Sequence, residues 1–413
     1  MTETSDAQIS GIGDVFPFDP TDPVFRADPY PTYNRLREAS AIHGTPLGLW
    51  VLTRHADVVG VLHHPETSND QRNSKAFQQF LESGAESPFE DRTQSFLFLD
   101  PPDHTRLRGL VSHAFTPRRV RELGPRITEI VDGLLDDAIA RGELEGVEEF
   151  AYPIPIWVIC ELLGVPPSDN VIFKEWSREL ARSLDPEVML PPEMLERRQR
   201  ASDGLNGYLT GLIAERTEQP RDDLLSALIA VEQEGEKLTH EELLVTCGLL
   251  LIAGHETTVN LIANGLLAFA QNPEQYQALR ADPSLAKPAV EEVLRYDPPV
   301  QLTGRIAMTE MPIGGQTVSA GEQAVCLIGA ANRDPDAFDD PDRFDITRKP
   351  GPHIAFGAGI HFCLGAPLAR LEGEIAFRRL AERVGGFELD GEPSYKDAFV
   401  LRGLDRLPLR LRT

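Results

Sequence analysis

Cysteine is scarce in this sequence. Its four cysteines, Cys160, Cys247, Cys326 and Cys363, lie far apart and none forms a CxxC pair. This spacing argues against a disulfide framework and a zinc finger, and it favours a reducing, cytoplasmic compartment. Basic residues are also in deficit, with 40 Lys and Arg against 65 Asp and Glu. The net charge of −25 predicts a surface that repels nucleic acid and anionic membranes.

The N-terminal stretch MTETSDAQISGIGDVFPFD lacks the basic start and apolar run of a signal peptide. We therefore expect neither secretion nor an N-terminal membrane anchor. The chain shows no obvious repeat and no low-complexity linker. We expect a single domain over 1–413, mainly α with a smaller β region.

The hydrophobic pattern divides that domain into regions. β-rich portions are predicted near 40–55 and 300–350, and the helical bulk over 100–290. The stretch VRELGPRITEIVDGLLDDAIARG (120–142) predicts one amphipathic helix that stops at Gly142. A cysteine-containing loop and the last long helix are predicted over 352–384.

A long central helix is predicted over 238–273, where Thr239 and Glu242 form a capping box. It is apolar on all sides, which is typical of a membrane span or of the axis of a large core. Polar residues along it, including His255 and Asn260, favour the core. Glu256 lies in mid-helix, where a carboxylate is costly without a partner or a task. From spacing alone it is either a packing contact with a basic residue or part of a site.

The loop FGAGIHFCLG (356–365) places Cys363 just before a predicted helix. Unpaired N–H groups and the helix dipole favour a thiolate there, the form that binds metal or attacks carbon. Gly357 allows backbone shapes closed to other residues, and Gly365 allows close approach of a bulky group. A cysteine nucleophile with His361 as its base is a competing interpretation, and a buried free cysteine is another.

Several motifs together resemble the cytochrome P450 family. FGAGIHFCLG is similar to its haem-binding loop, and AGHETT (253–258) to its oxygen-activating segment. EEVLRYDPP (291–299) contains the family's E-x-x-R, and DPDRFDI (340–346) supplies the matching arginine. DPPDHTRLRGLVSHAFTPR (100–118) resembles its haem-side helix. The resemblance spans about residues 48–365 and implies the triangular P450-type fold around a long central helix.

The resemblance implies haem b (iron protoporphyrin IX) with Cys363 as the axial metal ligand, whose thiolate favours O–O cleavage. It implies propionate contacts from His104, Arg108, Arg305 and His361, and further haem contacts from Ala253, Phe356, Gly357 and Gly365. It also implies a structural charge network of Glu292, Arg295 and Arg343. Glu256 and Thr257 would be the catalytic pair that delivers protons during dioxygen cleavage.

The implied activity is a monooxygenase that inserts one atom of O2 into an apolar small molecule of macrolide, terpenoid, steroid or fatty-acid type. Its electrons would come from a ferredoxin and a ferredoxin reductase, as in the soluble bacterial branch. Arg118, Arg119 and Arg370 are candidates for the docking face. The expected apolar pocket walls are Leu249, Ile252, Val300, Leu302 and Val400, and the expected variable segments include 66–98 and a lid at 183–200.

Three alternatives remain beside this activity. A peroxide-driven peroxygenase would carry an arginine–proline pair in place of Glu256 and Thr257, and that pair is absent. A haem sensor or carrier without turnover would not need Glu256 and Thr257. A cysteine-dependent hydrolase would not need Arg108, Arg305 or the E-x-x-R network.

Overall fold

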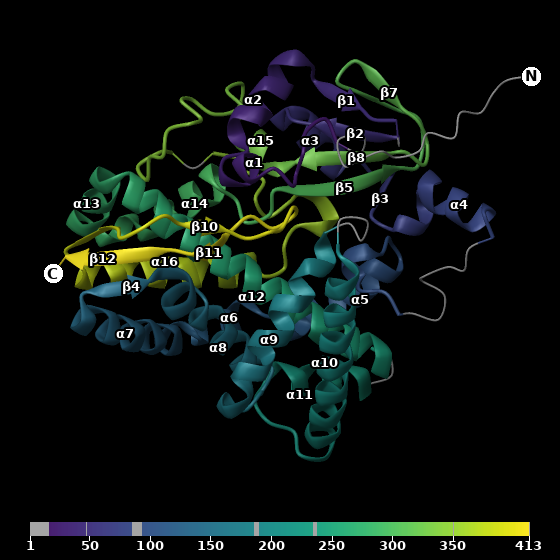
Figure 1. Cartoon of the computed structure of the whole chain (residues 1–413). Helices are drawn as coiled ribbons and strands as arrows, with labels where there is room; N and C mark the ends of the chain where they lie inside the picture. Colours follow the sequence, from purple (N-terminus) through teal and green to yellow (C-terminus); the bar gives the residue numbers. More distant parts are fainter. Residues whose placement is uncertain are drawn as a thin grey trace, which may run out of the picture.

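The structure is a computed structural model that describes residues 16–46, 48–84, 93–185, 190–233, 238–349 and 351–412. The variable segment 66–98 and the expected lid at 183–200 therefore lie partly outside the described residues. Helices make up most of the described chain, with small sheets toward its two ends (Figure 1). This confirms a mainly α fold with a smaller β region.

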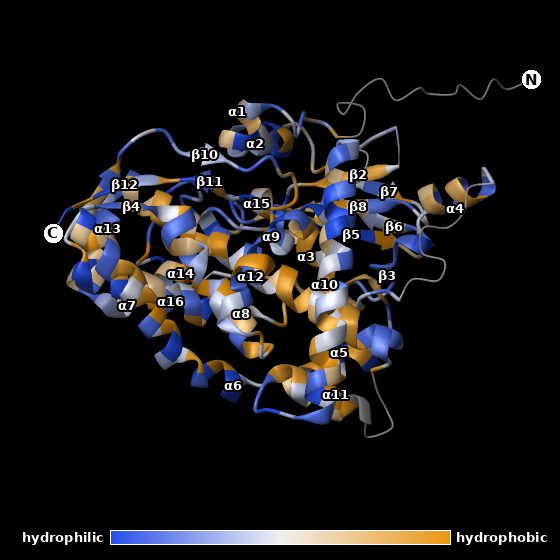
Figure 2. Cartoon of the chain, turned by 60° about the horizontal axis from the view of Figure 1, so that its bottom comes forward, coloured by the Kyte–Doolittle hydropathy of each residue, from blue (hydrophilic) through white to orange (hydrophobic). Residues whose placement is uncertain are grey.

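The central helix is α12, His240–Gln271. It begins at the predicted capping box, in which Thr239 accepts from the Glu242 N–H and the Glu242 side chain accepts from the Thr239 N–H. Its neighbours are α8 (Pro153–Leu162), α9 (Asn170–Ala181), α10 (Pro192–Glu218), α14 (Ala286–Tyr296) and α16 (Ala366–Arg383). Hydrophobic residues gather on α12 at the centre of the molecule (Figure 2).

The apolar character of α12 reflects its place in the interior. Among the described residues it is the one helix long and apolar enough to cross a membrane, and 56% of its most apolar stretch is buried inside the protein. Close packing also requires Gly265, because a Cβ there would lie 2.3 Å from the Phe377 ring on α16. The helix therefore serves as the axis of the largest hydrophobic core cluster.

The single helix predicted over 120–142 is in fact two, α6 (Pro117–Glu122) and α7 (Gly124–Arg141). Pro125 explains the break, because it has no N–H to donate to the carbonyl four residues earlier. The predicted stop is confirmed: Gly142 caps α7 in the left-handed region with φ of 74°. α7 packs against α16, which follows the cysteine loop.

The main sheet brings both predicted β-rich portions together. Its five strands lie in the order β1 (Ile42–Gly44), β2 (Leu49–Leu52), β8 (Gln323–Leu327), β5 (Leu302–Ala307) and β3 (Thr67–Ser68). β2 and β8 are parallel, and the other pairs are antiparallel. α3 (His55–His63) follows β2, as predicted, and packs near β8.

A second sheet joins β4 (Glu143–Glu145), β12 (Pro408–Arg412) and β9 (Gly386–Leu389), so the C-terminal strands return to the end of α7 (Figure 1). The remaining strands form two pairs, β6 (Met311–Ile313) with β7 (Gln316–Val318) and β10 (Ser394–Tyr395) with β11 (Leu404–Arg406). The remaining helices are α1 (Pro23–Ala27), α2 (Tyr30–Ala39), α4 (Lys75–Glu82), α5 (Asp103–Ala114), α11 (Leu224–Gln233), α13 (Pro273–Ala281) and α15 (Ile328–Ala331).

Candidate functional site

The cysteine loop is a tight structure at the start of α16. The Cys363 N–H donates to the Phe356 carbonyl at 2.9 Å, which closes the loop, and α16 begins at Ala366. Gly357 and Gly359 both have φ of 68°, the left-handed region that favours glycine. A Cβ on Gly359 would lie 2.4 Å from the Leu62 carbonyl of α3. The loop is therefore fixed against α3 and places the cysteine at the helix start, as the sequence predicts.

The Cys363 thiol is exposed, whereas the other three cysteines are buried. Its surroundings are dense enough that burial raises its pKa, although the N–H groups of Gly365 and Ala366 and the charges of Arg108 and Arg370 act in the opposite direction. The N–H groups at the helix start thus act in the predicted direction, since they favour the thiolate, and burial opposes them. A bound metal cation would stabilise the thiolate further.

The four predicted propionate residues lie together beside the cysteine loop. The His104 and His361 rings are 4.4 Å apart between centroids. Arg108, on α5, donates to the Phe362 carbonyl, which directly precedes Cys363. Arg305, on β5, is buried and donates to Asn69 Oδ1 at 3.0 Å. Three elements distant in the sequence thus bring four basic side chains to one place.

This basic cluster has the chemistry of a site for a dianionic group. Both ring nitrogens of His104, and Nδ1 of His361, are buried without a hydrogen-bond partner. Burial, Arg305, His104 and Arg108 together lower the pKa of His361 to about 3. Burial and the charge of Arg108 also lower the pKa of His104. Two carboxylates placed here would satisfy the unpartnered ring nitrogens and offset the crowded positive charge, so these residues fit the propionates of haem.

Glu256 is buried in mid-helix and has a basic partner. Its Oε1 accepts from Lys396 Nζ, and the same Nζ donates to Asn260 Oδ1 at 2.8 Å. Its Oε2 has no hydrogen-bond partner. Sequence spacing left two alternatives for Glu256, a packing contact with a basic residue or a place in the site. Lys396 is the basic partner that the packing contact requires. The free Oε2 leaves a role in the site open as well.

Thr257, the other half of the predicted catalytic pair, is half-buried. Its Oγ1 donates to the Ala253 carbonyl at 2.8 Å, one helical turn earlier. This is a common use of threonine in a helix. Ala253 is exposed, although most of the C-terminal half of α12 is buried.

The predicted charge network needs a correction. Arg295 forms a bidentate pair with Glu292, both distances being 2.8 Å, and both side chains are buried. The Arg343 side chain does not join them; it is 63% exposed and lies 3.5 Å from Asp345. Arg343 contributes its carbonyl, which accepts from Arg295 at 3.0 Å. The second arginine on Glu292 is Arg348, whose Nε lies 3.3 Å from the carboxylate.

The predicted apolar wall residues are all half-buried: Leu249, Ile252, Val300, Leu302 and Val400. Two parts of this wall lie side by side, since Val300 forms an isolated bridge with Leu401 and the Gln301 N–H donates to the Val400 carbonyl at 2.9 Å. Leu249 and Ile252 lie on α12 and pack against a different core cluster from Leu302 and Val400.

Sequence reasoning missed two residues of this region, Lys396 and Arg348. Lys396 lies in SYKDAFV, which has no periodicity or motif that points to α12, 140 residues away. Arg348 follows Arg343 by five positions in a turn, and only the local backbone path decides which of the two guanidinium groups faces inward.

The chain is similar to a large set of known proteins. A family model described as Cytochrome P450 matches residues 169–389. Cytochrome P450 107B1 of Saccharopolyspora erythraea is 42% identical over 401 residues, 94% of this chain and 96% of that protein. Cytochrome P450 monooxygenase PikC of Streptomyces venezuelae is 44% identical over 399 residues, 94% and 92% of the two chains. The ligand-free crystal structure of CYP164A2 from Mycobacterium smegmatis is 47% identical, covers 95% of this chain and 98% of its own, and has a TM-score of 0.87.

Proposed function

Because this chain belongs to the cytochrome P450 family and is a haem-thiolate monooxygenase, we propose that it binds haem b through Cys363 and oxygenates an apolar small molecule. The cluster of four basic side chains beside Cys363 carries this assignment, because the unpartnered ring nitrogens of His104 and His361 and the charges of Arg108 and Arg305 suit the two propionates of that haem. Phe356, Gly357, Gly365 and Ala253 would contact the haem ring, as the family motifs imply.

When bound, haem supplies the activation of dioxygen by electrons from a redox partner. The chain's own residues would take up and deliver the protons. Thr257 carries a half-buried hydroxyl on α12, and the neighbouring Glu256 carries a buried carboxylate. In this role, the carboxylate takes up a proton and the hydroxyl orients its delivery.

The substrate we propose is a sizeable apolar molecule of macrolide, terpenoid, steroid or fatty-acid type. The expected wall is apolar and half-buried at Val300, Leu302 and Val400. Relatives support the same class: one is named Vitamin D(3) 25-hydroxylase and another 6-deoxyerythronolide B hydroxylase. Similar structures hold myristic acid and testosterone.

We propose a ferredoxin and its reductase as the electron source, because Glu256 and Thr257 stand where a peroxygenase carries arginine and proline. Charge on the expected docking face gives this pairing little support. Arg118 pairs with Glu122, and Arg370 binds Glu291. Arg119 faces Asp222 at 3.6 Å, so each expected arginine has an acidic neighbour.

The assignment is tested by the carbon monoxide difference spectrum of the reduced protein. Wild type should give the thiolate-type Soret shift, and Cys363→Ser should lose it, because serine does not supply a thiolate. Cys160→Ser is the matched control, since Cys160 is buried away from the loop and should leave the spectrum unchanged. A thiolate-type spectrum in Cys363→Ser would overturn the assignment.

The substrate class is tested by screening macrolactones, terpenoids, steroids and fatty acids for a shift of the ferric Soret band. A compound that shifts the band is then incubated with ferredoxin, reductase and NADPH, and separately with hydrogen peroxide alone. Product in the first mixture and little in the second supports the proposed monooxygenase. Equal product with peroxide alone would favour the peroxygenase instead.

A further inference from the structure

The loop at 396–403, between β10 and β11, contacts two distant parts of the chain. Lys396 Nζ binds Glu256 and Asn260 on α12. The N–H groups of Phe399 and Val400 both donate to Asp185 Oδ1, at 3.0 and 2.9 Å, just beyond α9. The 396–403 loop therefore joins the buried carboxylate of α12 to the end of α9.

Lys396 is the cation nearest to Glu256. His255 Nδ1 lies 3.9 Å from Glu256 Oε2, but it faces Ser177 Oγ at 2.8 Å. Burial alone would raise the pKa of Glu256. The charges of Lys396, His255 and Arg178 outweigh burial and lower that pKa. Tyr152, which packs on the His255 ring at 4.3 Å, completes the titratable groups around the carboxyl.

This arrangement conflicts with a simple proton-delivery role. A carboxylate held in an ion pair binds a proton weakly, and a buried carboxylate without a partner binds one strongly. Glu256 can therefore carry a proton only when Lys396 moves away. Lys396 has fewer backbone constraints than Glu256, because it belongs to a loop whereas Glu256 belongs to the 32-residue helix α12.

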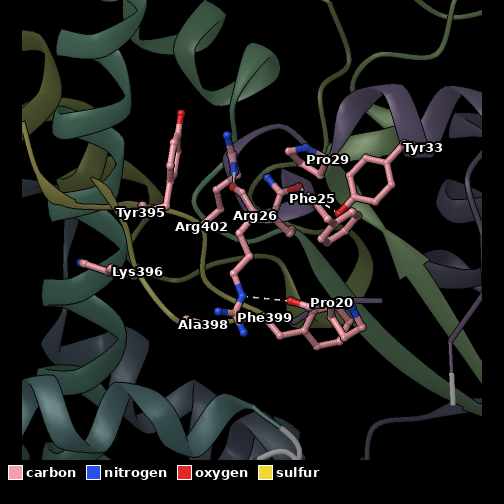
Figure 3. Close-up of a pocket in the computed structure, with 12 residues that line it drawn as sticks. Pro20, Phe25, Arg26, Pro29, Tyr33, Tyr395, Lys396, Ala398, Phe399 and Arg402 are labelled. Carbon is pink, nitrogen blue, oxygen red and sulfur yellow. Dashed lines mark hydrogen bonds between the residues drawn. The ribbon is translucent and has the colours of Figure 1, made fainter. Parts of the chain in front are cut away.

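The far side of the 396–403 loop borders a small pocket. Lys396, Ala398, Phe399 and Arg402 line it from the loop, and Tyr33 faces them from α2 (Figure 3). The loop lies between this pocket and α12, and Val400 on it belongs to the proposed apolar wall of the substrate site.

We propose that Lys396 is a positioning residue for Glu256, and that the 396–403 loop links their ion pair to the wall of the substrate pocket. The role of Glu256 in this inference rests on the proposed function. With the loop as observed, the pair keeps the carboxylate ionised. When a ligand at the Val400 wall moves the loop, Lys396 leaves Glu256 and keeps its own proton, and Glu256 takes a proton from hydronium, which leaves water. No electron moves in this step.

The ion pair is tested by infrared spectroscopy of the ligand-free holoenzyme at pH 7. Lys396→Met should show a protonated-carboxyl stretch that wild type lacks and that Lys396→Met/Glu256→Gln loses. Lys396→Arg, which restores the charge, should lack it. Asp397→Asn is the matched control, because Asp397 is the next residue but is exposed and pairs with Arg26. If Lys396→Met does not fold, Lys396→Gln removes the charge with a smaller change of polarity and should give the same signal.

The link through the loop is tested by Asp185→Ala, which removes the acceptor of the Phe399 and Val400 N–H groups without touching Glu256. Its protonated-carboxyl signal should lie between those of wild type and Lys396→Met. A signal equal to that of wild type would overturn the link, and a wild-type spectrum in Lys396→Met would overturn the whole inference. Unchanged product yield in Glu256→Gln would instead contradict the proposed function and leave the infrared result standing.

Discussion

Glu256 and Thr257 are neighbours in α12 but lie in different surroundings. Glu256 is buried against Lys396, whereas Thr257 is half-buried and bonded to its own helix. Different contacts therefore restrict the two side chains in proton transfer. The ion pair with Lys396 restricts the Glu256 carboxyl. The Thr257 hydroxyl donates to the Ala253 carbonyl at 2.8 Å, and it must leave this acceptor before it can donate to another group.

Thr257→Ala tests whether that hydroxyl works in catalysis or only in the helix. We expect normal haem content and substrate affinity, because Thr257 is not among the residues proposed to hold haem or to line the pocket. We also expect less product and more hydrogen peroxide per NADPH consumed, because a positioned acid–base group contributes about 100-fold or more to proton transfer. Product and peroxide yields per NADPH measure this.

Thr258→Ala is the control for Thr257→Ala. Thr258 also donates back to α12, to the Gly254 carbonyl at 3.3 Å, but it is buried on another side of the helix. Its variant should keep the yields of wild type. Equal yields in Thr257→Ala and wild type would assign the Thr257 hydroxyl to helix geometry alone.

At the scale of elements, α14 is fixed to the turn at 339–348 by the Glu292–Arg295 pair. Arg295 also donates to the Pro341 carbonyl at 2.7 Å and the Arg343 carbonyl at 3.0 Å. Arg348 closes the network from the other side, donating to the Asp340 carbonyl at 3.0 Å as well as facing Glu292. One buried carboxylate thus organises the turn that precedes the cysteine loop.

The two arginines of that turn make a matched pair of variants. Arg348→Met should lower the free energy of unfolding by about 1.5–3 kcal/mol, the range for hydrogen bonds to a charged group. Arg343→Met should change it by no more than about 0.5 kcal/mol, because that side chain is exposed and its carbonyl is kept. Urea unfolding of the holoprotein measures both. A larger loss of unfolding free energy in Arg343→Met would show that the Arg343 side chain belongs to the network, as the sequence motif predicted.

Two glycines of α12 give a second matched pair. Gly265→Ala should destabilise the protein by about 1–3 kcal/mol, because its Cβ would lie 2.3 Å from the Phe377 ring. Gly254→Ala should stabilise it by up to about 1 kcal/mol, because the nearest atom to its Cβ, Ile159 Cδ1, lies at an ordinary 3.5 Å. Thermal melting of both variants decides this. Loss of stability in Gly254→Ala would reveal a packing role for that glycine.

The sequence predicted the ends of several helices better than it predicted the contacts of the candidate site. The capping box of α12, the stop at Gly142 and the helix after Cys363 follow from local chemistry, and the structure confirms each. The break at Leu123 was missed because the apolar pattern continues through it, although Pro125 signals it. Lys396 was missed because its contact with Glu256 depends on the path of the whole chain.

At the scale of the whole molecule, many surface charges are paired, and the net charge of −25 is the excess of acidic over basic side chains. Exposed pairs of this kind each contribute little, and at 0.15 M salt interactions beyond about 8 Å are largely screened. The net repulsion among 65 acidic and 40 basic side chains remains as the long-range term that opposes the folded state. The protein should therefore be less stable at low salt concentration, where this repulsion is least screened.

We expect the melting temperature of the holoprotein to rise as NaCl increases from low concentration toward about 0.15 M, where the Debye length has fallen to about 8 Å. The reason is that screening removes the repulsion of the excess negative charge, whereas the buried pairs, such as Glu292 with Arg295, are screened much less. Calorimetry in sodium chloride measures the rise, and lysine-to-glutamine variants at exposed positions, which make the chain more acidic, should steepen it. A melting temperature that falls with salt would show that attractive surface pairs outweigh the net charge in holding the fold together.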